Sequence, residues 1–573
     1  MHTNKQNNTF GRSGWLVPNA KRSSAALLLA VLAACGGGGG GDGGGSSSGA
    51  SNTNNSSSTN NSNNTGTSGL PTLPAPSDEV QSGNSSGQSP GAGQGGQAVL
   101  KPIAGQVIGY ITYDSVPLTA SSGLDYASTQ KRPVREALVE VVDGGTVLAS
   151  GMTDSHGYYA LPVPTGREVV VRVQARMGSS DGRWNVAVRD NTGAGFPQAA
   201  PVYAMSSSKQ SVAAEGAVLD LHAASGWTGS NYGAVRVAAP FAILDQAYAS
   251  MQYMRALQSS LTFPALNIFW SVNNRSANGN FADGDIGSSN WSSAYGNVAE
   301  GIYVLGKENL DSDEFDTSVL SHEWLHYFEN KLGRSDSIGG AHAFGEKLDM
   351  RVAWSEGMAS GLSAAMRGSA IFVDSKGFRQ SLSSQFAVNE VPPADDRGFY
   401  SERSVQYLTY QLMQMASGPG AVLATLLNEQ KNTASATSVF SFVDGLRARL
   451  SGNAVDGLLN QVGLPAMSAI DAWGSSVRYD SFFAASIPVS NSLVTGSVVP
   501  VMCVSNGYGS YNHLDRYRPV RIDVPVAGRY RFAADGYGGA NARVDIYRQG
   551  VVAQMPVAAE VGSGDERDEL GSG

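Results

Sequence analysis

The first hundred residues of this chain include a segment that cannot form a packed domain. Residues 36–69 read GGGGGGDGGGSSSGASNTNNSSSTNNSNNTGTSG and contain almost no apolar side chain. Such a segment cannot offset the entropy that is lost when its backbone is ordered. Small and polar residues dominate as far as residue 97. We therefore expect residues 35–97 to be a disordered tether, and residues 98–573 to fold into several domains of ordinary size.

A short apolar run, AALLLAVLAA, occupies residues 25–34 behind a basic leader. It suits an export signal and is too short to span a bilayer. Residues 32–35, Leu-Ala-Ala-Cys, resemble the lipobox of bacterial lipoproteins. The resemblance implies a signal peptide over residues 1–34, lipidation of Cys35, and a place in the bacterial cell envelope, on the outer membrane or cell surface, held by the lipid alone. The alternative is an ordinary signal peptide whose cleavage site adjoins Cys35.

Composition narrows the range of partners. The chain of 573 residues has a net charge of −9, so it lacks the excess of Lys and Arg that binding to a phosphate backbone requires. We therefore expect no nucleic-acid partner. Two cysteines cannot make a disulfide framework, and lipidation of one would leave Cys503 unpaired. We expect Cys503 to be a small buried hydrophobic residue.

Residues 98–226 show apolar residues with a period of two, separated by turn signals such as DGG at residues 143–145 and TDSHG at residues 153–157. Short strands at this spacing predict a β-sandwich. The run over residues 133–175 resembles the carboxypeptidase regulatory-like domains, which carry the same TDxxGxY turn and no catalytic residues. His156 lies in this turn, so we expect it to be a surface residue.

Residues 227–487 change to longer amphipathic segments and contain the motif HEWLH at residues 322–326. A helix is expected over residues 315–332, ending at Gly333. His322 and His326 would then share one face and could bind the same ion, while Glu323 could reach a water on that ion. An HExxH pair on a helix is typical of zinc peptidases, which keep one metal position for water. A preceding apolar strand at residues 301–306 could hold an extended substrate by edge pairing.

An acidic segment, DSDEFD at residues 311–316, precedes this helix. Acidic residues stabilise a helix N-terminus, and we expect capping to be their role. A calcium site is the alternative, although no glycine-bearing loop with regular ligand spacing follows.

The third ligand identifies the type of zinc site. A metzincin would have glycine at position 329 and histidine at position 332, where this chain has Glu329 and Leu332. The segment AWSEGMAS at residues 353–360 instead resembles the gluzincin helix that supplies a glutamate ligand before small residues. The resemblance implies a zincin-like α+β peptidase domain over residues 227–487, with Zn²⁺ held by His322, His326 and Glu356.

Two glutamates compete for this role. Glu346 lies at the interval from His326 that thermolysin-like enzymes use, but it follows a glycine and precedes a lysine, as in a loop or an exposed first turn. Glu356 lies among apolar and small residues that would let its helix pack against the first. We therefore predict Glu356 as the ligand.

Further residues of the central region are candidates for supporting roles. Tyr400 occupies a downstream position like that of the tyrosine in aminopeptidase-like gluzincins, and the resemblance implies that it stabilises the oxyanion. Tyr407 and Tyr410 lie nearby, and packing is the alternative role for all three tyrosines. For His342, we favour a structural role in its loop over a role at the site.

After residue 487 the alternating pattern of strands returns, over residues 520–524, 530–533 and 544–547. It resembles the pre-peptidase-type β-sandwiches appended to secreted bacterial proteases. We expect a C-terminal β domain over residues 488–573, an incomplete copy that lacks a last strand, with His513 in it and outside the active site.

These observations predict a multidomain chain with an N-terminal β-sandwich, a central α+β zincin-like metallopeptidase domain and a C-terminal β-sandwich. The predicted function is that of a surface-anchored zinc metallopeptidase, an endopeptidase acting on peptides or proteins, with Glu323 as the base. The alternative is a binding lipoprotein, an adhesin whose peptidase-like domain is inactive.

Overall fold

The computed structural model describes residues 100–450, 452–494, 496–503, 508–523 and 526, and the backbone of four later strands. The signal peptide, Cys35 and the expected tether lie outside the described residues. Within the described part, no helix is long and apolar enough to cross a membrane. This part is a multidomain, mixed α/β structure with seven α-helices.

Thirteen strands lie between residues 100 and 230. They are β1 (Gln106–Ser115), β2 (Leu118–Thr119), β3 (Gly123–Leu124), β4 (Gln130–Pro133), β5 (Ala137–Asp143), β6 (Thr146–Met152), β7 (Tyr158–Pro162), β8 (Glu168–Gly178), β9 (Asn185–Arg189), β10 (Ala204–Ser206), β11 (Gln210–Ser211), β12 (Ala217–Val218) and β13 (Leu221–Ala223). β5 and β6 form the hairpin expected at residues 143–145. In β8 every second side chain is buried, as the period of two predicts. His156 is exposed in its turn, as expected.

These strands belong mainly to two sheets. The first sheet centres on β1, which pairs in parallel with β12 and β13 and antiparallel with β4 and β7. The second sheet has nine strands and includes β5, β6, β8 and β9, with β10 and β11 also paired to β8. Side chains from both sheets join one hydrophobic core cluster.

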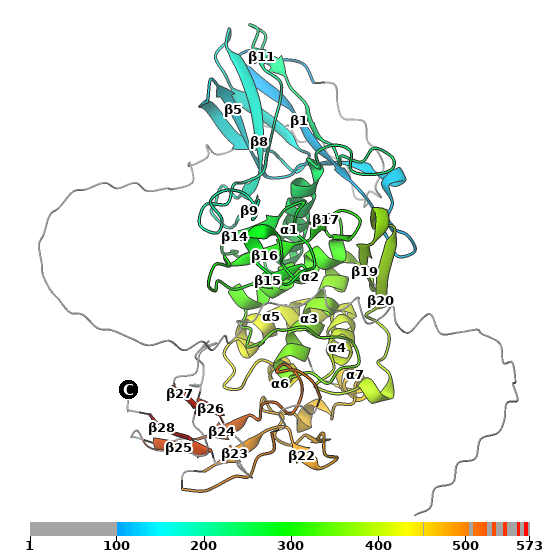
Figure 1. Cartoon of the computed structure of the whole chain (residues 1–573), viewed down its shortest axis with the longest axis vertical. Helices are drawn as coiled ribbons and strands as arrows, with labels where there is room; N and C mark the ends of the chain where they lie inside the picture. Colours follow the sequence, from blue (N-terminus) through cyan, green and yellow to red (C-terminus); the bar gives the residue numbers. More distant parts are fainter. Residues whose placement is uncertain are drawn as a thin grey trace, which may run out of the picture.

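The second sheet continues past residue 226 into the centre of the molecule. Its later strands are β14 (Leu266–Trp270), β15 (Asn290–Ser292) and β16 (Gly301–Val304), in the order β15-β16-β14-β9-β8-β5-β6. β9 and β14 run parallel, with Val188 opposite Ile268. A single sheet therefore links the strand-rich N-terminal part to the helices below it (Figure 1). β16 lies between two strands, so the edge of the sheet belongs to β15 and not to residues 301–306.

The α-helices follow in sequence. They are α1 (Ala238–Leu257), α2 (Thr317–Lys331), α3 (Met350–Arg367), α4 (Glu402–Gln414), α5 (Gly418–Thr425), α6 (Val439–Leu446) and α7 (Asn453–Gln461), with the π-helical turn η7 (Leu426–Gln430) after α5. A four-stranded sheet, β17 (Gly306–Lys307), β18 (Asp311–Ser312), β19 (Ile371–Lys376) and β20 (Leu382–Ala387), lies beside them (Figure 1). Trp324 of α2 and Trp354 of α3 are fully buried and anchor these helices in the core.

Two glycines of α3 lie at close approaches to α4. A Cβ atom on Gly357 would lie 2.6 Å from the Glu402 carbonyl oxygen, and one on Gly361 would lie 2.1 Å from Thr409 Oγ1. The glycines of this helix were expected to let it approach the HExxH helix. They instead allow close packing on α4, and the contacts to α2 come from serines on another face of α3.

Short strand pairs follow α7. They are β21 (Arg478–Asp480) with β22 (Ser486–Pro488), β23 (Asn491–Leu493) with β24 (Val520–Ile522), β25 (Tyr530–Ala534) with β28 (Glu566–Leu570), and β26 (Arg543–Ile546) with β27 (Ala558–Val561). Figure 1 shows them at the end of the molecule away from β1. Cys503 is exposed, which corrects the expectation of a buried thiol. It lies in an irregular stretch outside the strands and helices.

Candidate metal centre

The HExxH segment lies on α2, close to the predicted helix bounds. His322 and His326 are one turn apart, so both side chains leave the same face of the helix. Both histidines are buried, although α2 is polar for a core helix. The polar face is buried because α3 and β15 pack against it.

Two nitrogen atoms and one oxygen atom lie close together beside this face of α2. The Nε2 atoms of His322 and His326 lie 3.0 Å apart, and each lies 3.2 Å from Oε2 of Glu356. Glu356 comes from α3 and is 1% exposed. The structure thus brings together the three residues that the sequence predicts as ligands, and this group could hold a metal ion.

Two serines of α3 orient the imidazole rings. Ser355 Oγ lies 3.2 Å from His326 Nδ1 and donates its only hydrogen to Glu329 at 2.6 Å. With this hydrogen engaged, Ser355 Oγ can accept a hydrogen bond from His326 Nδ1, which would leave the lone pair of the neutral ring on Nε2. Ser360 Oγ lies 3.2 Å from His322 Nδ1 and can act in the same way. No sequence pattern singled out these serines, although both lie in the SEGMAS segment with Glu356.

The donor set fits a metal ion. An ion bound at about 2.0–2.1 Å by tetrahedral ligands separates those ligands by about 3.3–3.4 Å, close to the distances found here. A carboxylate oxygen and a nitrogen lone pair at this separation repel each other unless a positive charge lies between them. Two imidazoles and one carboxylate suit borderline cations such as Zn²⁺.

The pKa values of the group also favour a bound cation. Burial lowers the pKa of His326, but the Glu356 carboxylate outweighs burial and raises this pKa to about 9. Burial lowers the pKa of His322 to about 4. For Glu356, burial would raise the pKa, yet the charges of His326 and His342 hold it well below its usual range. The pocket therefore favours a positive charge beside an ionised Glu356.

Glu323 lies beside this group with one carboxylate oxygen free. Its Oε2 accepts a 2.9 Å hydrogen bond from the backbone N–H of Trp291 in β15, and its Oε1 is buried without a hydrogen-bond partner. Burial raises its pKa to about 8. The side chain is thus held in place at one oxygen, and the other can receive a proton.

His342 joins the group, although the sequence analysis favoured a role in its loop. Its Nε2 lies 3.7 Å from Oε2 of Glu356 and 3.5 Å from Oε2 of Glu402 at the start of α4. Burial lowers its pKa, but these two carboxylates outweigh burial and raise the pKa overall. A second buried His–Glu pair thus adjoins the three ligands, and neither His342 nor Glu402 stands in a recognisable motif.

Residues 512–514, in the C-terminal part of the chain, hold the loop that carries His342 in place. The Asn512 side chain donates to the Ala341 carbonyl, and the Leu514 N–H donates to the Lys347 carbonyl. His513 Nε2 lies 3.3 Å from Oε2 of Glu346. His513 therefore supports this loop through its contact with Glu346.

The structure does not bring the other candidates to the three ligands. Glu346 is half-exposed and accepts from the Ala343 N–H. Tyr400 packs on Phe399 and under Lys347, and Tyr407 donates to Gln461. Tyr410 is partly exposed on α4. An oxyanion role for Tyr400 therefore stays a prediction, whereas Nε2 of His342 lies 3.7 Å from the Glu356 ligand oxygen.

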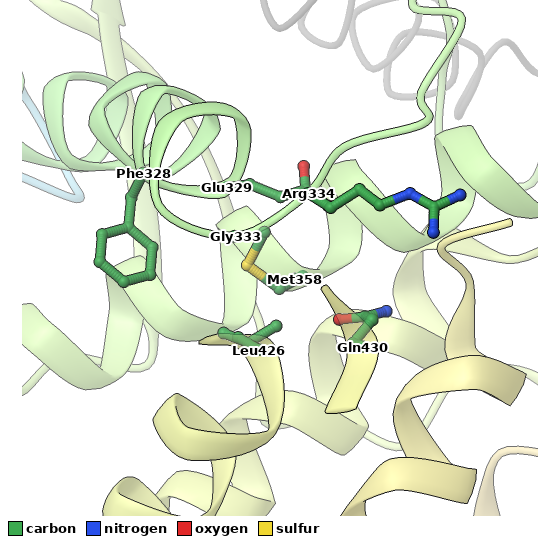
Figure 2. A pocket seen from close by; sticks show the side chains of 7 residues that line it. All are labelled: Phe328, Glu329, Gly333, Arg334, Met358, Leu426 and Gln430. Carbon is green, nitrogen blue, oxygen red and sulfur yellow. The ribbon is translucent and has the colours of Figure 1, made fainter. Parts of the chain in front are cut away.

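A small crevice lies behind the group, between the end of α2, the middle of α3 and η7 (Figure 2). It is lined by Phe328, Glu329, Gly333, Arg334, Met358, Leu426 and Gln430. It includes none of the three ligands, and of the site it touches only Glu329, which supports Ser355. The crevice therefore lies beside Glu329, the residue that holds Ser355, and not at the three ligands.

No protein-family model matches this chain, and no curated protein matches its sequence.

Proposed function

We propose that this chain is a zinc-dependent metallopeptidase that hydrolyses peptide bonds. The observation that carries the proposal is the convergence of His322, His326 and Glu356 on one point, with the free oxygen of Glu323 beside them. Each imidazole ring also has a serine within hydrogen-bonding distance of its Nδ1 atom, Ser355 for His326 and Ser360 for His322.

Each residue has a distinct role in this proposal. His322, His326 and Glu356 hold the ion. Bound Zn²⁺ would supply a Lewis acid that activates water and polarises the scissile carbonyl. Glu323 takes the proton from the attacking water at Oε1 and delivers it to the leaving amine. His342, held between Glu356 and Glu402, is a donor that could face the developing oxyanion, a role that the family resemblance implied for Tyr400.

The edge strand β15 gives a reason to favour an extended peptide as the substrate. β15 ends the nine-stranded sheet, so one side of the strand has no neighbouring strand among the described residues. The Trp291 N–H donates to Glu323 and therefore points away from β16. All three residues of β15 are buried, so a peptide that added to this edge would have to displace the segments that cover it. It would then pass the Glu323 carboxylate, which accepts the Trp291 N–H.

The proposal also covers the types of the three domains. We infer that the two N-terminal sheets form a β-sandwich of the carboxypeptidase regulatory-like type, and that the central part is a zincin-like domain of the gluzincin type. The HExxH helix, the glutamate on a second helix and the sheet edge beside them support this inference. The last strand pairs would form the C-terminal pre-peptidase-type module.

Metal removal tests the proposal. The purified protein should contain about one zinc per chain by elemental analysis and should cleave an unfolded protein. A chelator should remove the zinc and abolish cleavage, and added Zn²⁺ should restore both, because the chain itself supplies no Lewis acid. Stoichiometric zinc without turnover on a broad peptide library would favour the alternative, a binding lipoprotein with an inactive peptidase-like domain.

The proposed location rests on the lipobox. Cells that express the protein should incorporate labelled fatty acid into it, because the Cys35 thiol is the acceptor in this motif. Cys35→Ala should remove the label and release the protein in soluble form. Labelling of Cys35→Ala, or an unlabelled wild-type protein, would contradict lipidation at this residue.

A further inference from the structure

A second group of ionisable side chains lies between the acidic segment before α2 and strand β19. Asp311 and Asp313 come from the segment, and Asp374 comes from β19. One carboxylate oxygen of each residue lies within 4.8 Å of the others. The group shares no residue with the His322, His326 and Glu356 site.

Asp374 is the observation that points to a ligand. Its side chain is 4% exposed, and its Oδ1 is buried without a hydrogen-bond partner. Oδ1 of Asp313 is also buried and unpartnered, while its other oxygen accepts a hydrogen bond from Ser289. Lys376 lies opposite Asp311 in the β18–β19 pairing. Among the described residues, however, no Lys, Arg or His forms an ion pair with any of the three aspartates.

Helix capping does not account for these carboxylates. Asp316 is the N-cap residue of α2 but makes no capping hydrogen bond with its side chain. Both of its oxygens instead accept from the backbone N–H and the hydroxyl of Ser375 in β19. The other three carboxylates lie next to this connection, and buried charges without a counter-charge are strongly unfavourable.

We propose that Asp311, Asp313 and Asp374 bind a calcium ion. All the donors are carboxylate oxygens, which hard cations prefer and which distinguish this group from the histidine-containing site. Ca²⁺ accepts several protein carboxylates directly, whereas Mg²⁺ usually keeps most of its waters and binds one or two. One divalent ion would offset most of the negative charge of the three aspartates.

The position of the site gives the ion a structural role. β19 contacts α2 through the bond from the Val373 N–H to Ser318 Oγ. Phe372 of the same strand packs edge-on against the ring of His322. A calcium ion between the acidic segment and β19 would therefore fix the start of α2 against the strand that supports the first metal ligand.

Calcium titration into the chelator-treated, dialysed full chain tests this site without any use of enzyme activity. About one Ca²⁺ should bind per chain in equilibrium dialysis, and the Tm should rise by about 3–6 °C at saturation. Asp374→Asn should abolish the response. Without calcium, this variant should be at least as stable as the wild type, because it removes one buried charge.

The controls separate this site from its neighbours. Asp395→Asn, at an exposed aspartate, should keep the full calcium response. Glu356→Gln should keep it too, because calcium does not use the histidine site. If Asp374→Asn does not fold, Asp311→Asn makes the same comparison at a partly exposed position. The absence of calcium binding up to about 10 mM, or an unchanged calcium response in the aspartate variant, would overturn the proposal.

Discussion

Glu323→Gln should reduce the peptidase activity by about 10²–10⁴-fold while the protein keeps its zinc. Glutamine has the shape of glutamate, and its carbonyl oxygen can still accept the hydrogen bond from the Trp291 N–H. The fold and the metal ligands should therefore be unchanged. The amide cannot take a proton from water, so the loss should appear in kcat. Steady-state kinetics on an unfolded protein or a peptide measure it, with zinc counted on the same sample.

Glu300→Gln is the matched control. Glu300 forms a surface ion pair with Lys331 at the far end of α2, and such pairs contribute about 0–1 kcal/mol to stability. This variant should keep its activity. If Glu323→Gln retained wild-type turnover with bound zinc, Glu323 would not be the base, and His342 with Glu402 would become the next pair to test.

The parts of the site that follow from local sequence were predictable. Helix periodicity, Gly333 and the acidic residues before the motif placed α2 within two residues of its observed bounds. Within a helix, a spacing of four fixes the relative direction of two side chains, so the meeting of His322 and His326 follows from the motif alone. Glu356 was predictable because its apolar and small neighbours indicated a buried helix.

The parts that depend on contacts between distant segments were not predictable. His342 reaches the site from a loop with no periodic pattern, and a lone histidine in a loop has no spacing to a partner. The continuation of the N-terminal sheet into β14 depends on the pairing of Val188 with Ile268, and the alternation that predicts a strand does not identify its neighbour.

The acidic segment illustrates the same limit. Its composition predicted capping of α2, because acidic residues before a helix usually have that role. In the structure, Asp374 of β19 lies beside Asp311 and Asp313, and Asp316 accepts a hydrogen bond from Ser375. Both contacts involve a distant strand, so no pattern within residues 311–316 could indicate them. Similarly, cysteines are usually buried, so Cys503 was predicted to be buried. It is exposed, and a residue-type preference carries no information on whether the segment around the residue lies at the surface.

Glu356→Ala should lower the affinity for zinc by more than about 100-fold, since loss of residues that merely orient a ligand costs about 10–100-fold. The variant removes the only carboxylate of the three-ligand group, and α3 brings no other acidic side chain to that position. Two imidazoles alone would hold the ion weakly. Zinc retained after dialysis against a weak chelator measures the change, and activity should fall with it.

Glu346→Ala is the control that separates the two glutamates. Glu346 is half-exposed, accepts from the Ala343 N–H and faces His513, so its loss should loosen the loop that carries His342 without removing a metal ligand. We expect this variant to keep its zinc and to show at most a modest fall in turnover through the position of His342. If Glu346→Ala lost the metal while Glu356→Ala kept it, the ligand role would pass to Glu346. The loop at residues 341–349 would then have to refold around the ion, because in the present structure Glu356 is the carboxylate that lies 3.2 Å from both histidines.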